Sequence, residues 1–90
     1  LHLLNYPNPF NSSTYIRYTL PETQSIILSI YNLAGQKIAT LADGIYSAGS
    51  HVVQWKGQNP LGHTHASSIY ICRLQTATGQ QLTQQLLLLR

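Results

Sequence analysis

The sequence predicts an all-β fold, an antiparallel β-sandwich of about seven strands without a disulfide bond. Apolar and polar residues alternate with a period of two along most of the chain, which is typical of strands with one buried face. Turn-forming residues separate the alternating stretches at even intervals, as in sandwiches and barrels. The chain has one cysteine, Cys72, so no disulfide can form within it. Packing alone must hold the two sheets together.

In the first half of the chain the alternation predicts strands over residues 2–4, 14–20, 26–31 and 37–41. A proline-rich segment separates the first two of them. Residues 32–36 are expected to form a hairpin loop in which Gly35 takes positive φ. Residues 42–50 are expected to be mainly loop, because Asp43-Gly44 and Ala48-Gly49 are turn-forming pairs.

In the second half the alternation predicts strands over residues 51–55, 68–75 and 81–89, joined by a polar loop and a turn. Trp55 is expected to point inward from a central strand, with His51 beside it. Tyr70 precedes Cys72 by two residues, the spacing of the tyrosine corner in immunoglobulin-like sandwiches. The phase of the strands assigns ten residues to the core: Ile16, Tyr18, Leu28, Ile30, Ile38, Val53, Trp55, Tyr70, Cys72 and Leu74.

The composition fits one small domain over residues 1–90. The hydrophobic fraction of 43% supplies one core, whereas the charged fraction is only 8%, well below the usual quarter. The five cations are spread along the chain, so no basic patch for nucleic acid is predicted. No apolar run approaches the roughly 18 residues that span a bilayer. The chain has no methionine and begins at Leu1, so we expect it to be the end of a longer protein.

The sequence offers no plausible catalytic constellation, and we expect neither enzymatic activity nor a cofactor. Its only acids are Glu22 and Asp43, and no G-x-S-x-G turn is present to expose a serine nucleophile. Cys72 points inward, where burial makes a thiol inert. His63 and His65 are weak candidates for metal ligands, because a metal site needs a third or fourth ligand. The sequence favours an ordinary pair of loop histidines.

Several segments together resemble one protein family. They are Tyr6-Pro7-Asn8-Pro9-Phe10-Asn11, Ser13-Thr14-x-Ile16-Arg17-Tyr18, Ile30-Tyr31-Asn32-Leu33-Ala34-Gly35-Gln36, Ala48-Gly49-x-His51-x-Val53-x-Trp55-x-Gly57, Ser67-x-Ile69-Tyr70-x-x-Arg73-Leu74 and Gln85-Leu86-Leu87-Leu88-Leu89-Arg90. In order and spacing they resemble the type A C-terminal sorting domain of type IX secretion. That domain is similar to the immunoglobulin-like domain of flagellar hook-capping proteins. The chain departs from the family pattern at Lys56, Ser68, Gln85 and Arg90.

The resemblance implies a domain at the C-terminal end of a secreted enzyme or adhesin. Such a domain passes through the periplasm, is recognised by the outer-membrane secretion machinery and takes its cargo to the cell surface. The relation to hook-capping proteins implies a different role, a structural or self-assembling extracellular module such as a filament or surface-layer subunit. A third hypothesis is a carbohydrate-binding module, with Trp55, Tyr15, Tyr31 or Tyr46 as sugar platforms.

Two segments are the candidate recognition sites for a partner. The first consists of Pro7, Asn8, Pro9 and Phe10, whose prolines favour extended, polyproline-like backbone. The second consists of Leu86, Leu87, Leu88, Leu89 and Arg90. Its leucines are apolar on both strand faces, and its arginine is expected to stay solvated. Either loop residues of the chain or a partner is expected to cover the outer face. An uncovered apolar edge invites strand addition by a receptor or by a second copy of the chain. Structural roles are assigned to Trp55, Tyr70, Gly35 and Gly49.

Overall fold

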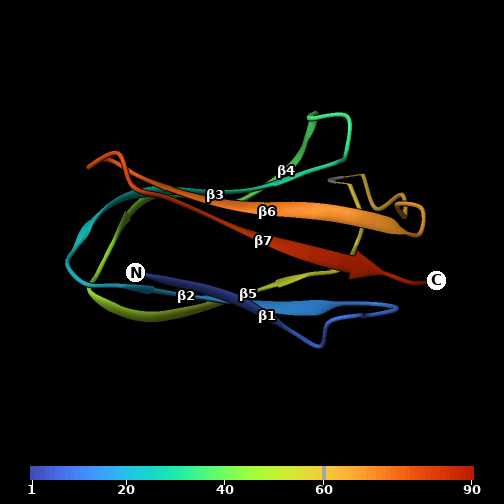
Figure 1. Cartoon of the computed structure of the whole chain (residues 1–90), viewed down its shortest axis with the longest axis horizontal. Helices are drawn as coiled ribbons and strands as arrows, with labels where there is room; N and C mark the ends of the chain where they lie inside the picture. The colour runs from blue at the N-terminus through green and yellow to red at the C-terminus, as the bar shows by residue number, and fades with distance from the viewer. Residues whose placement is uncertain (60) are drawn as a thin grey trace.

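The computed structural model describes residues 1–59 and 61–90, which form two antiparallel sheets packed face to face (Figure 1). In chain order the strands are β1 (His2–Tyr6), β2 (Thr14–Leu20), β3 (Gln24–Tyr31), β4 (Lys37–Tyr46), β5 (Gly49–Trp55), β6 (Ser68–Thr76) and β7 (Gln81–Leu88). One sheet has the order β1-β2-β5, and the other has the order β4-β3-β6-β7. The described part of the chain contains no helix, and so none that could span a membrane. The predicted all-β sandwich is confirmed.

The core lies between the two sheets. Of the ten residues predicted to form it, Ile38 and Val53 are only half-buried, and the other eight are buried. Both exceptions lie on edge strands, β4 and β5, where no further strand covers them. The buried core also contains residues that the predicted set omitted: Phe10, Leu20, Ile26, Ala42, Leu86 and Leu88.

The strand β4 is longer than the sequence predicted. It continues to Tyr46 through Asp43 and Gly44, where a loop was expected. Asp43 pairs with Ile27 of β3, and two register shifts farther along the pairing each absorb one extra residue of β4. The prediction of a loop was wrong for residues 42–46, because pairing with the neighbouring strand outweighed the local turn preference of the Asp-Gly pair. Residues 47 and 48 do lie outside the strands, between β4 and β5.

Trp55 is buried, but its strand is the edge of the three-stranded sheet and not central. His51 does not lie beside Trp55 as expected, because its ring stacks on that of Tyr18, with 5.2 Å between centroids. The histidine near Trp55 is His65, at 6.2 Å. The hydroxyl of Tyr70 donates to the carbonyl of Ala66 at 2.6 Å, which is the geometry of a tyrosine corner.

The hairpin loop between β3 and β4 is closed by Asn32. Its carbonyl accepts the N–H of Gly35 at 3.0 Å, and its side chain both donates to and accepts from Gln36. Gly35 has a φ of 83°, a conformation that residues with side chains rarely adopt. Gly49, at the start of β5, has a φ of 114°. The closed loop holds Leu33 out on the surface, 66% exposed.

Candidate functional site

The proline-rich segment and the last strand meet at one edge of the sandwich. Residues 7–10, called here the strap, follow β1 of one sheet and reach β7 of the other sheet (Figure 1). Phe10 and Leu88 form a parallel bridge there. The two candidate recognition segments are therefore neighbours in space, although they stand at opposite ends of the sequence.

Four hydrogen bonds tie the strap to the outward edge of β7. The side-chain amide of Asn8 donates to the carbonyl of Gln85 and accepts the N–H of Leu87, both at 3.0 Å. The N–H of Phe10 donates to the carbonyl of Leu87 at 3.0 Å, and the N–H of Leu89 donates to the carbonyl of Phe10 at 2.9 Å. The expectation of an open edge was wrong here, because these backbone groups already have partners.

A polar network fixes the point at which the strap leaves β1. Asn5 is only 8% exposed. Its amide nitrogen donates to the hydroxyl of Thr14 at 3.2 Å, and its amide oxygen accepts from Gln84 at 2.8 Å and from Asn8 at 3.2 Å. The hydroxyl of Thr14 donates in turn to the carbonyl of Pro7 at 2.9 Å. Burial of these polar side chains is stable because each has a partner, and the network joins β1, β2, the strap and β7.

Phe10 anchors the end of the strap in the core. It is 3% exposed and contacts Trp55 edge to face, with 5.9 Å between ring centroids. Such aromatic pairs add to the stabilisation from buried area. The Tyr6–Pro7 and Asn8–Pro9 peptide bonds are both cis, and residues 7–9 form a bend. Because residues 7–9 form a bend, the expectation of extended, polyproline-like backbone was wrong.

The four consecutive leucines lie in three different environments. Leu86 and Leu88 are fully buried in the core. Leu87 is half-buried on the outer face, where it pairs with Ile69 of β6. Leu89 is 51% exposed. It lines a shallow hollow of about 400 Å³ with Pro7, Pro9, Phe10 and Asn11. The accessible apolar surface of the run is thus small and adjoins the strap.

Arg90 is exposed, as expected, but its side chain also makes hydrogen bonds. Its guanidinium donates to the carbonyls of His65 at 2.7 Å, Gly57 at 2.8 Å and Asn11 at 3.4 Å. Its backbone N–H donates to the hydroxyl of Ser67 at 2.7 Å. Gly57 is needed for this approach, because a Cβ there would lie 2.7 Å from a guanidinium nitrogen. Arg90 therefore fastens the end of β7 to two loops.

The side chains considered for chemistry lie in separate places. Cys72 is fully buried, and burial raises the pKa of its thiol to about 12. Glu22 lies in the link between β2 and β3, whereas Asp43 lies in β4. His63 is exposed, whereas the ring of His65 lies against aromatic residues of the core. Within residues 1–59 and 61–90, no group of three His, Cys, Asp or Glu side chains could hold a metal ion.

The outer face of the three-stranded sheet carries an apolar patch that the sequence analysis did not single out. Leu4, Tyr6, Tyr15 and Val52 are each about half or more exposed, and they surround Arg17 in a hollow of about 480 Å³. The outward phase of β1 and β2 is the signal that could have identified the patch. Among the proposed sugar platforms, Tyr15 is exposed, but the buried Trp55 is excluded.

The comparisons with known proteins give a family and a fold. The family model of the secretion system C-terminal sorting domain matches residues 5–88. No curated protein matches the chain. The chain is similar to the dimeric latent PorU from Porphyromonas gingivalis, with a TM-score of 0.75 and 14% identity, over 97% of this chain and 9% of that protein.

A second similar structure is PorZ from the same organism, described as an essential bacterial surface component of the type-IX secretion system. The TM-score is 0.71 and the identity 15%, over 98% of this chain and 11% of that protein. The chain thus spans about a tenth of each of the two proteins. At these identities the two structures show a shared fold.

Proposed function

The chain belongs to the family of secretion system C-terminal sorting domains, and we propose that its strap and residues 86–90 together form the surface that the machinery recognises. A domain of this family is a sorting signal that directs cargo of the type IX secretion system to the cell surface. The observation that carries the proposal is the set of hydrogen bonds from Asn8 and Phe10 to the edge of β7. These hydrogen bonds join the strap and residues 86–90 into one continuous surface.

We propose that residues 1–90 form a single domain at the C-terminal end of a longer cargo protein. Both sheets contribute to one hydrophobic core, and the family match extends over residues 5–88. A shared core and a family match of this length support one folding unit with one sorting role.

Recognition of this surface depends on shape and not on strand addition. The backbone groups at the end of β7 are paired with the strap, so a receptor finds no open edge there. The accessible groups are the side chains of Pro7, Pro9 and Leu89, which line the shallow hollow. Small rigid apolar side chains of this kind suit a complementary pocket.

We propose no catalytic role for the domain. The family acts as a sorting signal, and the thiol of Cys72 is buried with a pKa of about 12. Self-assembly by strand addition through residues 86–89 is disfavoured as well, because a second copy would first have to displace the strap. The sorting role therefore accounts for the surface better than a structural assembly does.

The test is surface delivery of a reporter fused to this domain in a host with a type IX secretion system. Leu89→Ser alters an accessible side chain of the recognition surface, so delivery should fall while the melting temperature stays unchanged. Ile45→Ser is the matched control, because Ile45 is 75% exposed and lies on β4 away from the strap. Deletion of residues 86–90 is less informative, since Leu86 and Leu88 are core residues. Full delivery by both Leu89→Ser and Leu89→Arg would contradict the proposal.

A further inference from the structure

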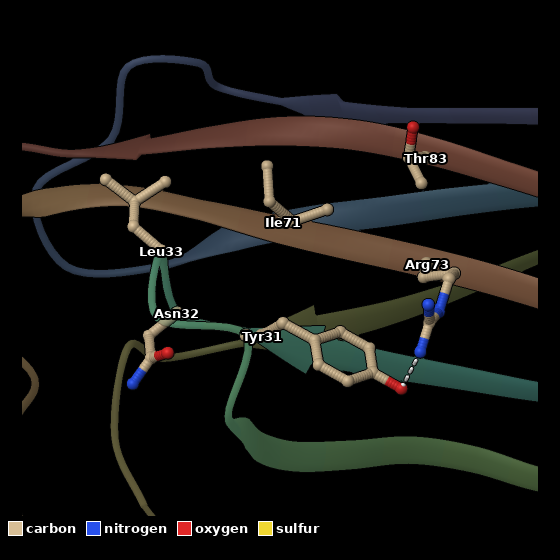
Figure 2. Close-up of a pocket in the computed structure, with 7 residues that line it drawn as sticks. Tyr31, Asn32, Leu33, Ile71, Arg73 and Thr83 are labelled. Carbon is tan, nitrogen blue, oxygen red and sulfur yellow. Dashed lines mark hydrogen bonds between the residues drawn. The ribbon is translucent and has the colours of Figure 1, made fainter.

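Another hollow lies on the outer face of the four-stranded sheet, and it shares no residue with the recognition surface. It measures about 310 Å³ and is lined by Tyr31, Asn32, Leu33, Gly35, Ile71, Arg73 and Thr83 (Figure 2). Two of the segments that the sequence analysis singled out, residues 30–36 and 67–74, meet here. Tyr31 at the end of β3 pairs with Ile71 of β6.

Arg73 is held in place at one side of this hollow. Its guanidinium lies over the ring of Tyr31, 4.2 Å from the centroid, and donates a hydrogen bond to the Tyr31 hydroxyl (Figure 2). Stacking on an aromatic ring orients the planar guanidinium. Within the described residues the buried Nε of Arg73 has no hydrogen-bond partner. Thr83, which pairs with Arg73 across β6 and β7, brings a hydroxyl to the same hollow.

In the part of the chain that the structure describes, the charge of Arg73 has no acid beside it. The chain has only two acids, Glu22 and Asp43. Glu22 lies in the link between β2 and β3, and Asp43 lies on β4, two strands from β6. Two strand spacings amount to about 10 Å, and the guanidinium of Arg73 is turned toward Tyr31. A guanidinium that is held in place and has no acid beside it is suited to bind a carboxylate of a partner, which would accept its hydrogen bonds.

The hollow also has an apolar side. Leu33 and Ile71 face it next to Tyr31 (Figure 2). Leu33 is 66% exposed, yet the loop that carries it is closed by the hydrogen bonds of Asn32 to Gly35 and Gln36. The hollow therefore combines aliphatic side chains with one oriented cation, as binding sites with an apolar lining and a few placed polar groups do.

We propose that this hollow binds a partner polypeptide through an acidic side chain that has an aliphatic side chain next to it. The carboxylate accepts hydrogen bonds from Arg73 and Thr83, and the aliphatic group packs on Leu33 and Ile71. The site goes beyond the sorting role, because the strap and the end of β7 take no part in it.

The test is a titration of the chain with the peptide N-acetyl-Glu-Leu-amide, followed by amide chemical shifts. The shifts should concentrate at Tyr31, Leu33, Ile71 and Thr83. N-acetyl-Gln-Leu-amide lacks the charge and N-acetyl-Glu-Ala-amide lacks the aliphatic group, so each should bind about three- to fivefold more weakly. Equal binding of the Glu and Gln peptides, or no binding of any, would overturn the proposal.

Variants of the chain test whether the peptide binds at this hollow. Arg73→Gln should abolish the preference for the Glu peptide, whereas Arg17→Gln, which removes a cation from the opposite sheet, should keep it. Thr83→Val and Leu33→Ser change exposed positions and should each weaken binding in a chain with an unchanged melting temperature, which keeps the test decisive if Arg73→Gln does not fold. A loss of preference that is as large for Arg17→Gln as for Arg73→Gln, or full binding by both surface variants, would refute a specific site.

Discussion

The C-terminal part of β7 has its edge covered, whereas the N-terminal part of the same strand has its edge open. The strap takes up the carbonyl of Gln85, both backbone groups of Leu87 and the N–H of Leu89. Alternation of the β6–β7 ladder points the N–H groups of Thr83 and Gln85 to the same side. There, no strand of the described residues is hydrogen-bonded to them, although β1 of the other sheet lies near β7.

The side chains of β7 also differ between the part that the strap covers and the part that it leaves open. The open part of β7 is rich in glutamine and threonine, and the covered part is made of leucines. An exposed apolar edge is a site for unwanted pairing with other chains. Here Leu86 and Leu88 are buried in the core. The backbone N–H of Leu87 donates a hydrogen bond to the side chain of Asn8 in the strap. The comparison shows that a run of four leucines is tolerated at a sheet edge because another segment of the chain covers that edge.

The difference between the covered and the open part of β7 should be affected most by removing Phe10, which anchors the strap in the core. Phe10→Ala deletes a buried ring that contacts Trp55, so the free energy of unfolding should fall by about 3–5 kcal/mol. That is a large part of the stability expected for so small a domain. Urea denaturation measures the change, and Ile45→Ala, at a 75% exposed position, should change stability by less than about 0.5 kcal/mol. Similar stability of the two variants would mean that the strap is not anchored in the core.

A smaller change removes the cover from the edge and keeps the anchor. Asn8→Ala deprives the N–H of Leu87 and the carbonyl of Gln85 of their partner. Because water can reach this edge, the cost should be about 1 kcal/mol. Asn11→Ala is the matched control, since Asn11 is exposed and only its backbone carbonyl is used, by Arg90. Equal denaturation midpoints for the two variants would exclude a bridging role for the Asn8 side chain.

The smallest expected effect is on the rate at which β7 opens locally, which the labelling of Cys72 reports. Cys72 pairs with Gln84 near the boundary between the two parts of the strand. Because burial raises the pKa of its thiol to about 12, the thiol stays protonated at pH 8 and reacts only after the structure opens. Asn8→Ala should therefore speed labelling of Cys72 by a thiol reagent about fivefold, in line with a loss of about 1 kcal/mol. Rapid labelling of the unaltered chain would show that the thiol is accessible.

Much of the fold could be predicted from the sequence, because the period-two pattern directly reports which face of a strand is buried. The inward phase of Ile16, Leu28 and Leu74 needed no knowledge of the partner strands. The length of β4 could not be predicted in the same way, because Asp43 and Gly44 adopt strand geometry through their pairing with β3.

The candidate site was predictable only in parts. The sequence singled out the proline-rich segment and the leucine run, but nothing local showed that they touch. Their contact is made by the side chain of Asn8, which bonds to Gln85 and Leu87, and by the backbone of Phe10, which bonds to Leu87 and Leu89. The fastening of Arg90 likewise depends on carbonyl groups of distant loops. Hydrogen bonds over such separations leave no periodic signal.

Amide hydrogen exchange along β7 tests the central claim most directly. The N–H groups of Leu87 and Leu89 donate to the strap, whereas those of Thr83 and Gln85 face the open edge. We predict that the first pair exchanges about a hundredfold or more slowly than the second pair, and that Asn8→Ala removes the protection of Leu87 while leaving that of Leu86. Equally fast exchange of all four edge amides would contradict the cover of this edge by the strap.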